Sequence, residues 1–296
     1  MSFCSEVKSE LCAIKLQNCC NVAQCYGLFL FSKNFSYKEI SHRTQQQCIA
    51  KLYSSMLKNN FAILTSIKLG GEKVKNYSVG INTPAECARV MEAFGYTSHD
   101  TLFINRDVFK KECCFGAFIR GAFLACGQMS DPFKNYHAEF VIRDLSLALS
   151  FYELLEERGL SPLRSMRRNS MVIYFNKSET IEELLTVMGA TSKVFELIDV
   201  QITKNIRNKE NRKNNFELGN IDKQVEAFIT QSNAIEKLKK NGKFYLLDKT
   251  LINAAELRIN NPEASLSELC KLSEEPLTRS GLNHRLKKLI ELAEND

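Results

Sequence analysis

CCFGAFIRGAFLACG, at residues 113–127, decides the fold, because the chain contains a second version of it. Residues 19–33 read CCNVAQCYGLFLFSK, 94 positions earlier, and the two stretches share both leading cysteines, one alanine and one glycine. The same offset of 94 aligns NTPAECARVMEAFG, at residues 82–95, with NKSETIEELLTVMG, at residues 176–189. Two separate matches at one offset indicate an internal duplication over roughly the first two-thirds of the chain.

Each copy of the repeated stretch has an alanine and a glycine four residues apart, Ala23/Gly27 and Ala117/Gly121, which places both on one face of a helix. A glycine inside a helix costs about 1 kcal/mol relative to alanine, but it lets another backbone come close. A buried helix that merely contains a glycine would explain one copy. Because the pattern occurs twice, we expect the two helices to pack together through these faces at a pseudo-twofold axis.

IRGAFLACG, at residues 119–127, and CYGLFLFSK, at residues 25–33, resemble the twin helices of the LAGLIDADG homing endonucleases. The resemblance implies a duplicated scaffold in which a carboxylate near the end of each helix holds a catalytic divalent metal. Here those two positions are Ser32 and Cys126, and neither is the hard oxygen anion that Mg²⁺ prefers. The resemblance therefore supports the scaffold and argues against the catalysis.

The composition is that of a globular chain, with 44% hydrophobic and 25% charged residues. No apolar run approaches the roughly 20 residues that a membrane span requires, and residues 1–11 lack the apolar core of a secretory signal. A net charge of +6 fits a nucleic-acid partner. We expect a cytoplasmic protein that does not associate with a membrane, in a compartment that keeps cysteines reduced.

The chain has eleven cysteines, and none forms a CxxC pair. A metal cluster could be suggested for Cys12, Cys19, Cys20 and Cys25. Adjacent Cys19 and Cys20 point to different faces of a helix, which weakens that interpretation. We therefore expect no metal and no other cofactor, with the cysteines acting as small buried hydrophobic residues.

Hydrophobic periodicity predicts a similar order of elements in the two repeats, and hence an α+β layer with sheets on one side and helices on the other. Thr83 and Ser178 are the predicted caps of the last helix in each repeat. The predicted helices cover residues 3–16, 19–33, 44–58, 84–94, 113–127, 145–158 and 179–188. The predicted strands cover residues 35–42, 61–69, 74–81, 136–143, 163–167 and 170–175, with a Gly70–Gly71 turn in the first half.

A basic segment follows the duplication. Residues 193–202 are predicted to be helical, and residues 204–215 (KNIRNKENRKNN) form either a linker or an exposed helical extension. A solvated connector and a phosphate-binding segment explain this composition equally well. The candidate phosphate contacts are Lys204, Arg207, Lys209, Arg212 and Lys213. The predicted domains are residues 1–190, a linker at 191–215 and a helical domain at 216–296.

The last third predicts a helix-turn-helix at residues 264–293, after helices at 222–240 and 247–259. The helix at 222–240 would bury Val225, Phe228, Ile229, Ile235 and Leu238. Ser265, followed by Glu268, gives a capping box. The final helix has an apolar stripe of Leu282, Leu286, Leu289 and Ala293 opposite a polar, cationic face.

In a helix-turn-helix, the first residues of the second helix meet base edges. Arginine can pair with guanine and asparagine with adenine, and lysines further along meet phosphates. The predicted DNA-contacting residues are Ser265, Thr278, Arg279, Ser280, Asn283, His284, Arg285, Lys287 and Lys288. A plain helical hairpin with a solvated charged face would give the same spacing.

A degenerate double LAGLIDADG scaffold followed by SGLNHRLKKL, at residues 280–289, resembles the WhiA family over nearly the whole chain. FCSEVKSEL at residues 3–11, the block at residues 120–140 and NKENRKNN at residues 208–215 carry the same resemblance. It implies a bacterial regulator of cell division, chromosome segregation or sporulation that binds DNA through its helix-turn-helix and does not cleave it. The chain departs from the family pattern at Cys126 and Gln128, in the scaffold.

We therefore expect a non-enzymatic regulator on the nucleoid, with double-stranded DNA as partner and other transcription or division proteins as further candidates. Arg164, Arg167 and Arg168 cluster on the second-repeat hairpin, where they would contact DNA or form part of a protein-binding saddle. The alternatives are an active LAGLIDADG endonuclease and a ligand-sensing transcription regulator. The DNA target and the oligomeric state stay open.

Overall fold

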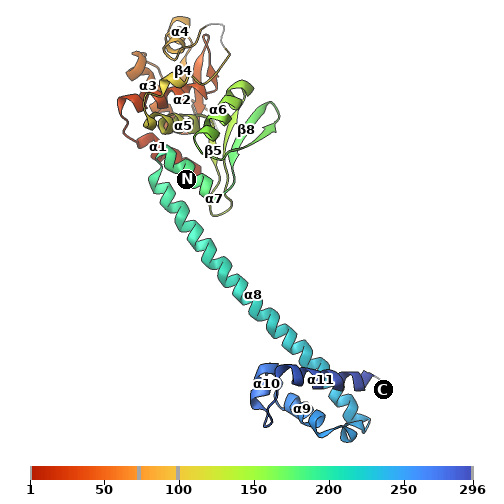
Figure 1. Ribbon diagram of the computed structural model, residues 1–296. Helices are drawn as coiled ribbons and strands as arrows, with labels where there is room; N and C mark the ends of the chain where they lie inside the picture. Colours follow the sequence, from red (N-terminus) through yellow and green to blue (C-terminus); the bar gives the residue numbers. More distant parts are fainter. Residues whose placement is uncertain (1, 72–74, 98–100, 295–296) are drawn as a thin grey trace. The chain divides into compact units, whose positions relative to one another are not determined.

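The computed structural model describes residues 2–71, 75–97 and 101–294 (Figure 1). Its contacts divide the chain into two compact units, Met1–Lys204 and Asn205–Asp296. Within the described ranges, no helix combines the length and the apolar composition that crossing a membrane demands. Each unit has its own buried core.

The first unit contains two four-stranded antiparallel sheets, one from each repeat. The strand orders are β1-β2-β4-β3 and β5-β6-β8-β7, so equivalent strands hold equivalent places. The strands are β1 Asn34–Phe35, β2 Ile40–Thr44, β3 Lys68–Gly70, β4 Asn76–Ile81, β5 Gly127–Met129, β6 Ala138–Ile142, β7 Leu163–Arg167 and β8 Ser170–Phe175. The predicted duplication and the α+β class are confirmed.

The helices of the first unit also occur in pairs. The repeated stretches form α2 and α5, which lie side by side at its centre (Figure 1). The helices are α1 Phe3–Ala13, α2 Asn18–Leu30, α3 Gln47–Phe61, α4 Pro84–Ala93, α5 Glu112–Cys126, α6 Leu145–Glu157 and α7 Ser178–Met188, with a 3-10 turn, η1, at Arg106–Val108.

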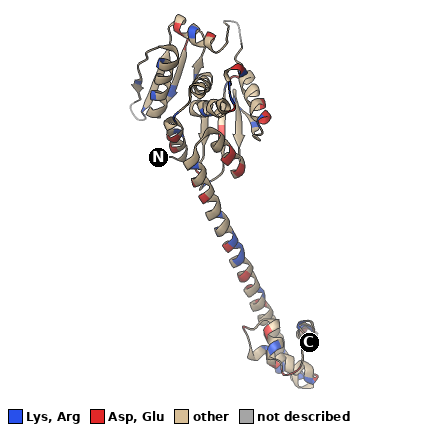
Figure 2. Cartoon of the chain, turned by 60° about the vertical axis from the view of Figure 1, so that its left-hand side comes forward, with Lys and Arg blue, Asp and Glu red and all other residues tan. Residues whose placement is uncertain are grey.

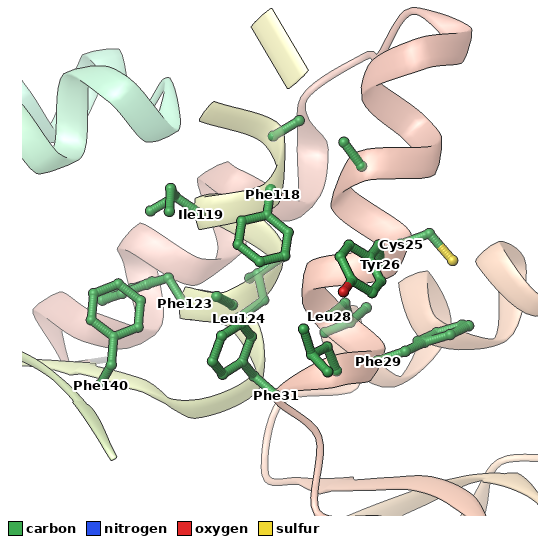
Figure 3. Packing of buried hydrophobic residues seen from close by; sticks show 14 of the residues in the cluster. Cys25, Tyr26, Leu28, Phe29, Phe31, Phe118, Ile119, Phe123, Leu124 and Phe140 are labelled. Carbon is green, nitrogen blue, oxygen red and sulfur yellow. The ribbon is translucent and has the colours of Figure 1, made fainter. Parts of the chain in front are cut away.

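Glycine allows α2 and α5 to meet backbone to backbone. A methyl group on Gly27 would overlap the carbonyl oxygen of Phe118, and one on Gly121 would overlap that of Gln24. These two overlaps are equivalent in the repeat. Aromatic side chains fill the space beside the crossing, with the rings of Tyr26 and Phe118 5.4 Å apart (Figure 3). The predicted pairing of the two helices is confirmed.

Two local predictions for the first repeat were wrong. Residues 35–42, predicted as one strand, form the short strand β1, a turn and the start of β2. Residues 61–67 precede β3 rather than belonging to it, because α3 continues to Phe61 and ends at Ala62 in the left-handed conformation. A short apolar run is compatible with helix, strand or loop, so periodicity could not separate them. The predicted turn at Gly70–Gly71 leads into residues 72–74, which lie outside the described residues.

The predicted caps of the closing helices also differ from the structure. Thr83 is the N-cap residue of α4, but its side chain makes no capping hydrogen bond. Pro84, at the first helical position, has no N–H to satisfy and presets the helical φ, which suffices to start the helix. Ser178 is the first residue of α7, and the N-cap is Lys177.

One helix, α8 Thr191–Lys240, replaces the predicted sequence of helix, basic segment and helix. The division between the two units falls inside it, at Lys204/Asn205. Residues 204–215 are therefore an exposed helical extension rather than a flexible linker. Charged and amide residues with straight side chains support a helix, and the single Gly219 costs only about 1 kcal/mol.

The second unit packs the end of α8 against three short helices and a 3-10 turn. These are η2 Lys243–Leu246, α9 Lys249–Asn260, α10 Leu266–Leu272 and α11 Arg279–Glu294. Ile235 and Leu238 of α8 are buried in this core, as predicted. Val225 and Ile229 are each 51% exposed, so their predicted burial was wrong. The buried residues of α8 in this unit lie between Gln231 and Leu238.

Candidate nucleic-acid interface

Two capping arrangements define where α10 and α11 begin. The Ser265 hydroxyl accepts the N–H of Glu268 at 3.3 Å, and the Glu268 carboxylate accepts the N–H of Ser265 at 2.7 Å. The predicted capping box is confirmed. At the start of α11, the Thr278 hydroxyl accepts the N–H of Gly281 at 3.1 Å. Ser265 and Thr278 were both predicted to contact DNA. In the structure their hydroxyl oxygens accept backbone N–H groups at the starts of α10 and α11.

The inner face of α11 is the predicted apolar stripe. Leu282, Leu286, Leu289 and Ala293 are all buried, in one cluster with Leu269 of α10 and Leu251 of α9. Burying four such side chains stabilises the unit by several kcal/mol, at about 1.5–3 kcal/mol for each large one. Because this face is anchored, the opposite face of α11 is held outward.

Arg258 of α9 positions the loop that leads into α10, and no pattern in the sequence predicted that role. It is 3% exposed, and its guanidinium donates to the carbonyl oxygens of Ala264 at 2.6 Å and Pro262 at 2.7 Å. It also lies 5.0 Å from the ring of Phe228 on α8. Burial lowers the pKa of Arg258. One buried side chain therefore ties α8, α9 and the loop into α10 together.

The outer face of α11 holds most of the predicted contacts. Arg279, Ser280, His284, Lys287 and Lys288 are exposed, and Asn283 is half-buried. Arg279 and Asn283 line a groove of about 520 Å³, together with Ser265 and with Lys223 of α8. No sequence pattern indicated Lys223, because only the packing of α8 brings it to the same groove as Arg279 and Asn283 of α11.

Arg285 lies elsewhere. It lines a different groove of about 320 Å³, which also contains Glu256, Glu274 and Glu275. These carboxylates suit an arginine and repel a phosphate. The structure therefore separates Arg285 from the face that carries Arg279 and Asn283.

The arginines of the β7–β8 hairpin have differing surroundings. Arg167 donates two hydrogen bonds to Glu139, at 3.2 and 3.1 Å. Burial opposes the ionisation of Glu139, but the hydrogen bonds from His137 and Arg167 outweigh it and lower the pKa of Glu139. Arg164 stacks 4.7 Å from the ring of Tyr152. Arg168 sits at the turn, with φ of 54°. Arg167 is thus the one of the three whose charge is matched by a carboxylate in the described structure.

The basic residues of α8 fall into two groups. Lys204 donates to the carbonyl oxygen of Pro132 at 2.7 Å and lies 4.4 Å from the ring of Tyr136, so it is held by the first unit. The other four are exposed along α8 (Figure 2): Arg207, Lys209, Arg212 and Lys213. They are free to meet an anionic surface in a way that Lys204 is not.

A groove of about 400 Å³ lies at the ends of α2 and α5. Ser32 and Cys126 both line it. The Ser32 hydroxyl donates to the carbonyl oxygen of Leu28 at 2.6 Å. Burial raises the pKa of the Cys126 thiol to about 12, which keeps it protonated. Neither side chain supplies an anionic oxygen.

The charges around this groove are mostly positive. Lys33, Arg43 and Arg143 line it, and among its described lining residues the only acid is Asp144. The Asp144 carboxylate accepts the N–H of Leu147 at 2.8 Å and caps α6. Three cations line the groove, and its one carboxylate already caps α6. This balance of charge disfavours a divalent metal and favours an anion.

The acids that follow the two motifs do not compensate. Glu39 accepts the hydroxyl of Ser41 at 2.5 Å, and Asp131 accepts the N–H of Phe133 at 2.9 Å. Neither lines the groove. Among the described residues, no neighbouring acid therefore replaces the carboxylates that are absent from the two motif positions.

The cysteines that lie together differ from the four that the sequence suggested as a metal cluster. Cys19, Cys20, Cys113 and Cys114, at the starts of α2 and α5, have sulfur atoms within 4.8 Å of one another. Cys12 and Cys25 lie outside this group. The Sγ atoms of Cys19 and Cys20 are 4.0 Å apart, so the expectation that adjacent cysteines diverge was wrong here. Two equivalent pairs meet because the helix crossing is symmetric.

Comparisons with known proteins agree with this architecture. A family model described as the WhiA C-terminal HTH domain matches residues 211–293, and one described as the WhiA LAGLIDADG-like domain matches residues 115–207. The probable cell division proteins WhiA of Lachnoclostridium phytofermentans and Clostridium acetobutylicum are each 33% identical over 99% of this chain, and over 99% and 98% of their own lengths. The crystal structure of full-length WhiA from Thermotoga maritima matches with a TM-score of 0.60 at 23% identity, over 100% of this chain and 99% of that one.

Proposed function

This chain belongs to the WhiA family, and from that premise we propose that it is a DNA-binding regulator that does not cleave its target. The observation that carries the proposal is the geometry of α11. Its apolar stripe is buried, while the polar residues of its first turns are exposed or line an open groove. That is the part of a recognition helix that enters the major groove.

The residues of α11 divide by their place along the helix. Arg279 and Asn283, which share the groove at the start of α11, are the proposed base readers, with Ser280 and His284 beside them. Lys287 and Lys288 lie further along and contact phosphates. Lys223 of α8 adds a phosphate contact from the other wall of the groove. Arg285, which faces three glutamates, stays outside the proposed interface.

The proposed lack of cleavage rests on the groove at the ends of α2 and α5. Hydrolysis of DNA in this scaffold needs carboxylates to place divalent metal ions. The motif positions hold Ser32 and a protonated Cys126, and three cations face the space between them. We propose that this groove binds anions and does not catalyse their hydrolysis. The same holds for the exposed arginines of the β7–β8 hairpin and the free basic residues of α8.

The biological setting follows from the relatives. The curated WhiA proteins matched over their full length carry the name of probable cell division proteins. We propose a role in cell division at the nucleoid, in preference to control of sporulation, and other division or transcription proteins as further partners. The groove of about 400 Å³ would also suit a small anion, which favours the ligand-sensing alternative over an active nuclease.

Duplex binding measured against salt concentration tests the proposal, with Mg²⁺ present and the DNA checked for cuts. Full-length protein is compared with a chain that ends at Lys204, on duplexes selected by the full-length protein from genomic fragments. We expect the shortened chain to lose selective binding and the DNA to stay intact. Equal binding by the shortened chain would move the interface to the first unit, and cut DNA would restore the nuclease.

Point variants then separate base readout from phosphate contact. Replacing Arg279 and Asn283 with alanine is expected to relax discrimination between duplexes, by about 1–3 kcal/mol for each lost pair. Replacing Lys287 and Lys288 with alanine is expected to lower the slope of log affinity against log salt by about 2. Lys240→Ala, outside α10 and α11, is the matched control for lost charge. A similar effect of all three changes would contradict the assignment.

A further inference from the structure

We propose that Cys19, Cys20, Cys113 and Cys114 form a binding site for one Zn²⁺ ion, with two thiolate ligands from each repeat. All four sulfur atoms lie within 4.8 Å of one another. The Sγ atom of Cys19 is 4.0 Å from that of Cys20 and 4.0 Å from that of Cys113. In a tetrahedral site with zinc–sulfur bonds of about 2.3 Å, the sulfur atoms are about 3.8 Å apart. Rotation of the cysteine side chains, with sulfur displacements of a few tenths of an ångström to about one ångström, brings the four sulfur atoms to that spacing.

The backbone places these ligands before any metal arrives. Cys19 and Cys20 are the second and third residues of α2, and Cys113 and Cys114 are the second and third residues of α5. The close crossing at Gly27 and Gly121, about two turns further along, and the contact of Cys20 with the carbonyl oxygen of Cys113 hold the two helix starts together. The ligand set is therefore a product of the duplication, and a bound ion would join the two repeats.

Positive charge lies around the cluster, and it acts against the burial that raises the pKa values of the Cys20 and Cys114 thiols. Two helix N-termini point at the cluster, and neither N-cap residue, Gln17 or Lys111, uses its side chain to cap its helix. Each helix end carries roughly half a positive charge. The Arg120 guanidinium, held by Met188 and Gln24, also attracts Cys20. These positive charges offset the net charge of −2 on an ion with four thiolates.

Burial provides both a dry interior and an entrance. Cys20 and Cys114 are buried, Cys19 is partly buried and Cys113 is exposed. An ion can reach Cys113 from solvent and then displace a proton from each thiol, so that four protons leave as four zinc–sulfur bonds form. The Cys20 thiol, which now donates to the carbonyl oxygen of Cys113 at 3.6 Å, gives up that hydrogen bond.

The donor set determines which metal fits. Four sulfur ligands in tetrahedral reach suit Zn²⁺ and exclude Mg²⁺ and Ca²⁺, which need oxygen. The site is also separate from the nuclease-like groove. It lies at the starts of α2 and α5, and the groove lies at their ends, about 20 Å away at 1.5 Å per helical residue.

Co²⁺ uptake by the reduced full-length protein tests the site, because Co²⁺ reports tetrahedral thiolate ligation by its absorption. We expect one Co²⁺ per chain, with sulfur-to-metal charge-transfer bands, and displacement of that ion by Zn²⁺. Replacing Cys19 and Cys113 with serine should abolish the bands and weaken Zn²⁺ binding by more than 100-fold, beyond the roughly 10–100-fold cost of losing an outer-shell partner. Replacing Cys12 and Cys48, a second pair of cysteines in the same unit, should leave the charge-transfer bands and the Zn²⁺ affinity unchanged.

Alkylation of the unaltered protein provides a test that does not depend on a variant folding. Zn²⁺ should slow the alkylation of Cys19 and Cys113 and leave that of Cys48 unchanged, and a chelator should reverse this. Lack of protection, or equal Co²⁺ uptake by the variant without Cys19 and Cys113, would overturn the proposal. A Cys19–Cys113 disulfide in protein isolated without oxygen, together with no metal uptake, would also overturn it and identify an oxidised pair.

Discussion

At the scale of single residues, Gly27 and Gly121 have the most consequence for the fold. Each faces a backbone carbonyl of the opposite helix, so there is no flexible side chain that could move to accommodate a methyl group. Gly219 presents the opposite case. It lies in the exposed part of α8, with no atom near the place of a Cβ.

Gly121→Ala is therefore expected to destabilise the first unit by about 1–3 kcal/mol, even though alanine favours the helix itself. Gly27→Ala should behave in the same way, because the repeat makes the two positions equivalent. Gly219→Ala is the control, and it should leave the free energy of unfolding unchanged or raise it by up to about 1 kcal/mol. Denaturant unfolding measures all three. A stabilised Gly121→Ala protein would show that α2 and α5 do not touch there.

His42 is a second residue whose surroundings predict a measurable effect. It is buried and stacked on the ring of Tyr53, and its Nδ1 atom has no hydrogen-bond partner among the residues that the structure describes. Burial, assisted by the Lys8 ammonium, lowers the pKa of His42 to about 4. The unfolded chain titrates near 6.5, so between pH 6.5 and 4 it binds a proton that the folded chain does not.

The contribution of neutral His42 to stability is therefore complete above pH 6.5 and is lost as the pH falls towards 4. It amounts to roughly 3 kcal/mol at the lower limit. An NMR titration of the ring should show a midpoint near pH 4, and denaturant unfolding should show the corresponding loss of stability. A His42 midpoint near 6.5 would contradict the buried placement.

At the scale of elements, short helices depend on their ends. α10 has seven residues, too few for a helix to be stable alone. Its first turn is held by the reciprocal bonds between Ser265 and Glu268. Those bonds also lower the pKa of Glu268, through the hydrogen bonds from Ser265.

Ser265→Ala is expected to cost about 1 kcal/mol of the stability of the second unit, because it leaves an N–H of the first turn without its partner. Ser267→Ala, at an exposed position of the same helix, should have little effect. Thermal unfolding of both variants makes the comparison. Equal effects would mean that α10 does not need its cap, and that its packing through Leu269 suffices.

At the scale of the whole molecule, the buried residues form two separate clusters, one in each unit. Leu197 of α8 belongs to the core of the first unit, and Ala234, Ile235 and Leu238 belong to that of the second. The residues of α8 from 205 to 227 are exposed in the described structure. No buried side chains there couple the two cores.

We therefore expect two unfolding transitions. Gly121→Ala should shift one of them and Ser265→Ala the other, without crossing over. Calorimetry of the full-length protein and of the two variants measures this. A single transition that moves with either variant would mean that α8 transmits stability between the units.

The sequence by itself determined the features that depend on neighbours along the chain. Repetition at one offset predicted the paired helices, the spacing of Leu282 to Ala293 predicted the buried face of α11, and Ser265 with Glu268 predicted a cap. Local propensity and periodicity suffice for the buried face and the cap, because each involves residues a few positions apart. The pairing of the helices came instead from the repeat at an offset of 94. The same local signals could not decide the state of residues 204–215 or of the run after Phe61.

Only the tertiary structure decided which distant residues meet. It placed Arg285 in a groove with three glutamates, paired Arg167 with Glu139 and placed Lys223 in the same groove as Arg279. It also brought Cys19 and Cys20 to Cys113 and Cys114, across 94 residues of chain. These contacts come from how helices and sheets pack, and packing depends on the shape of every facing side chain at once. A pattern along one strand or helix does not contain that information, which is why the duplication was evident in the sequence and the cysteine cluster at its axis was not.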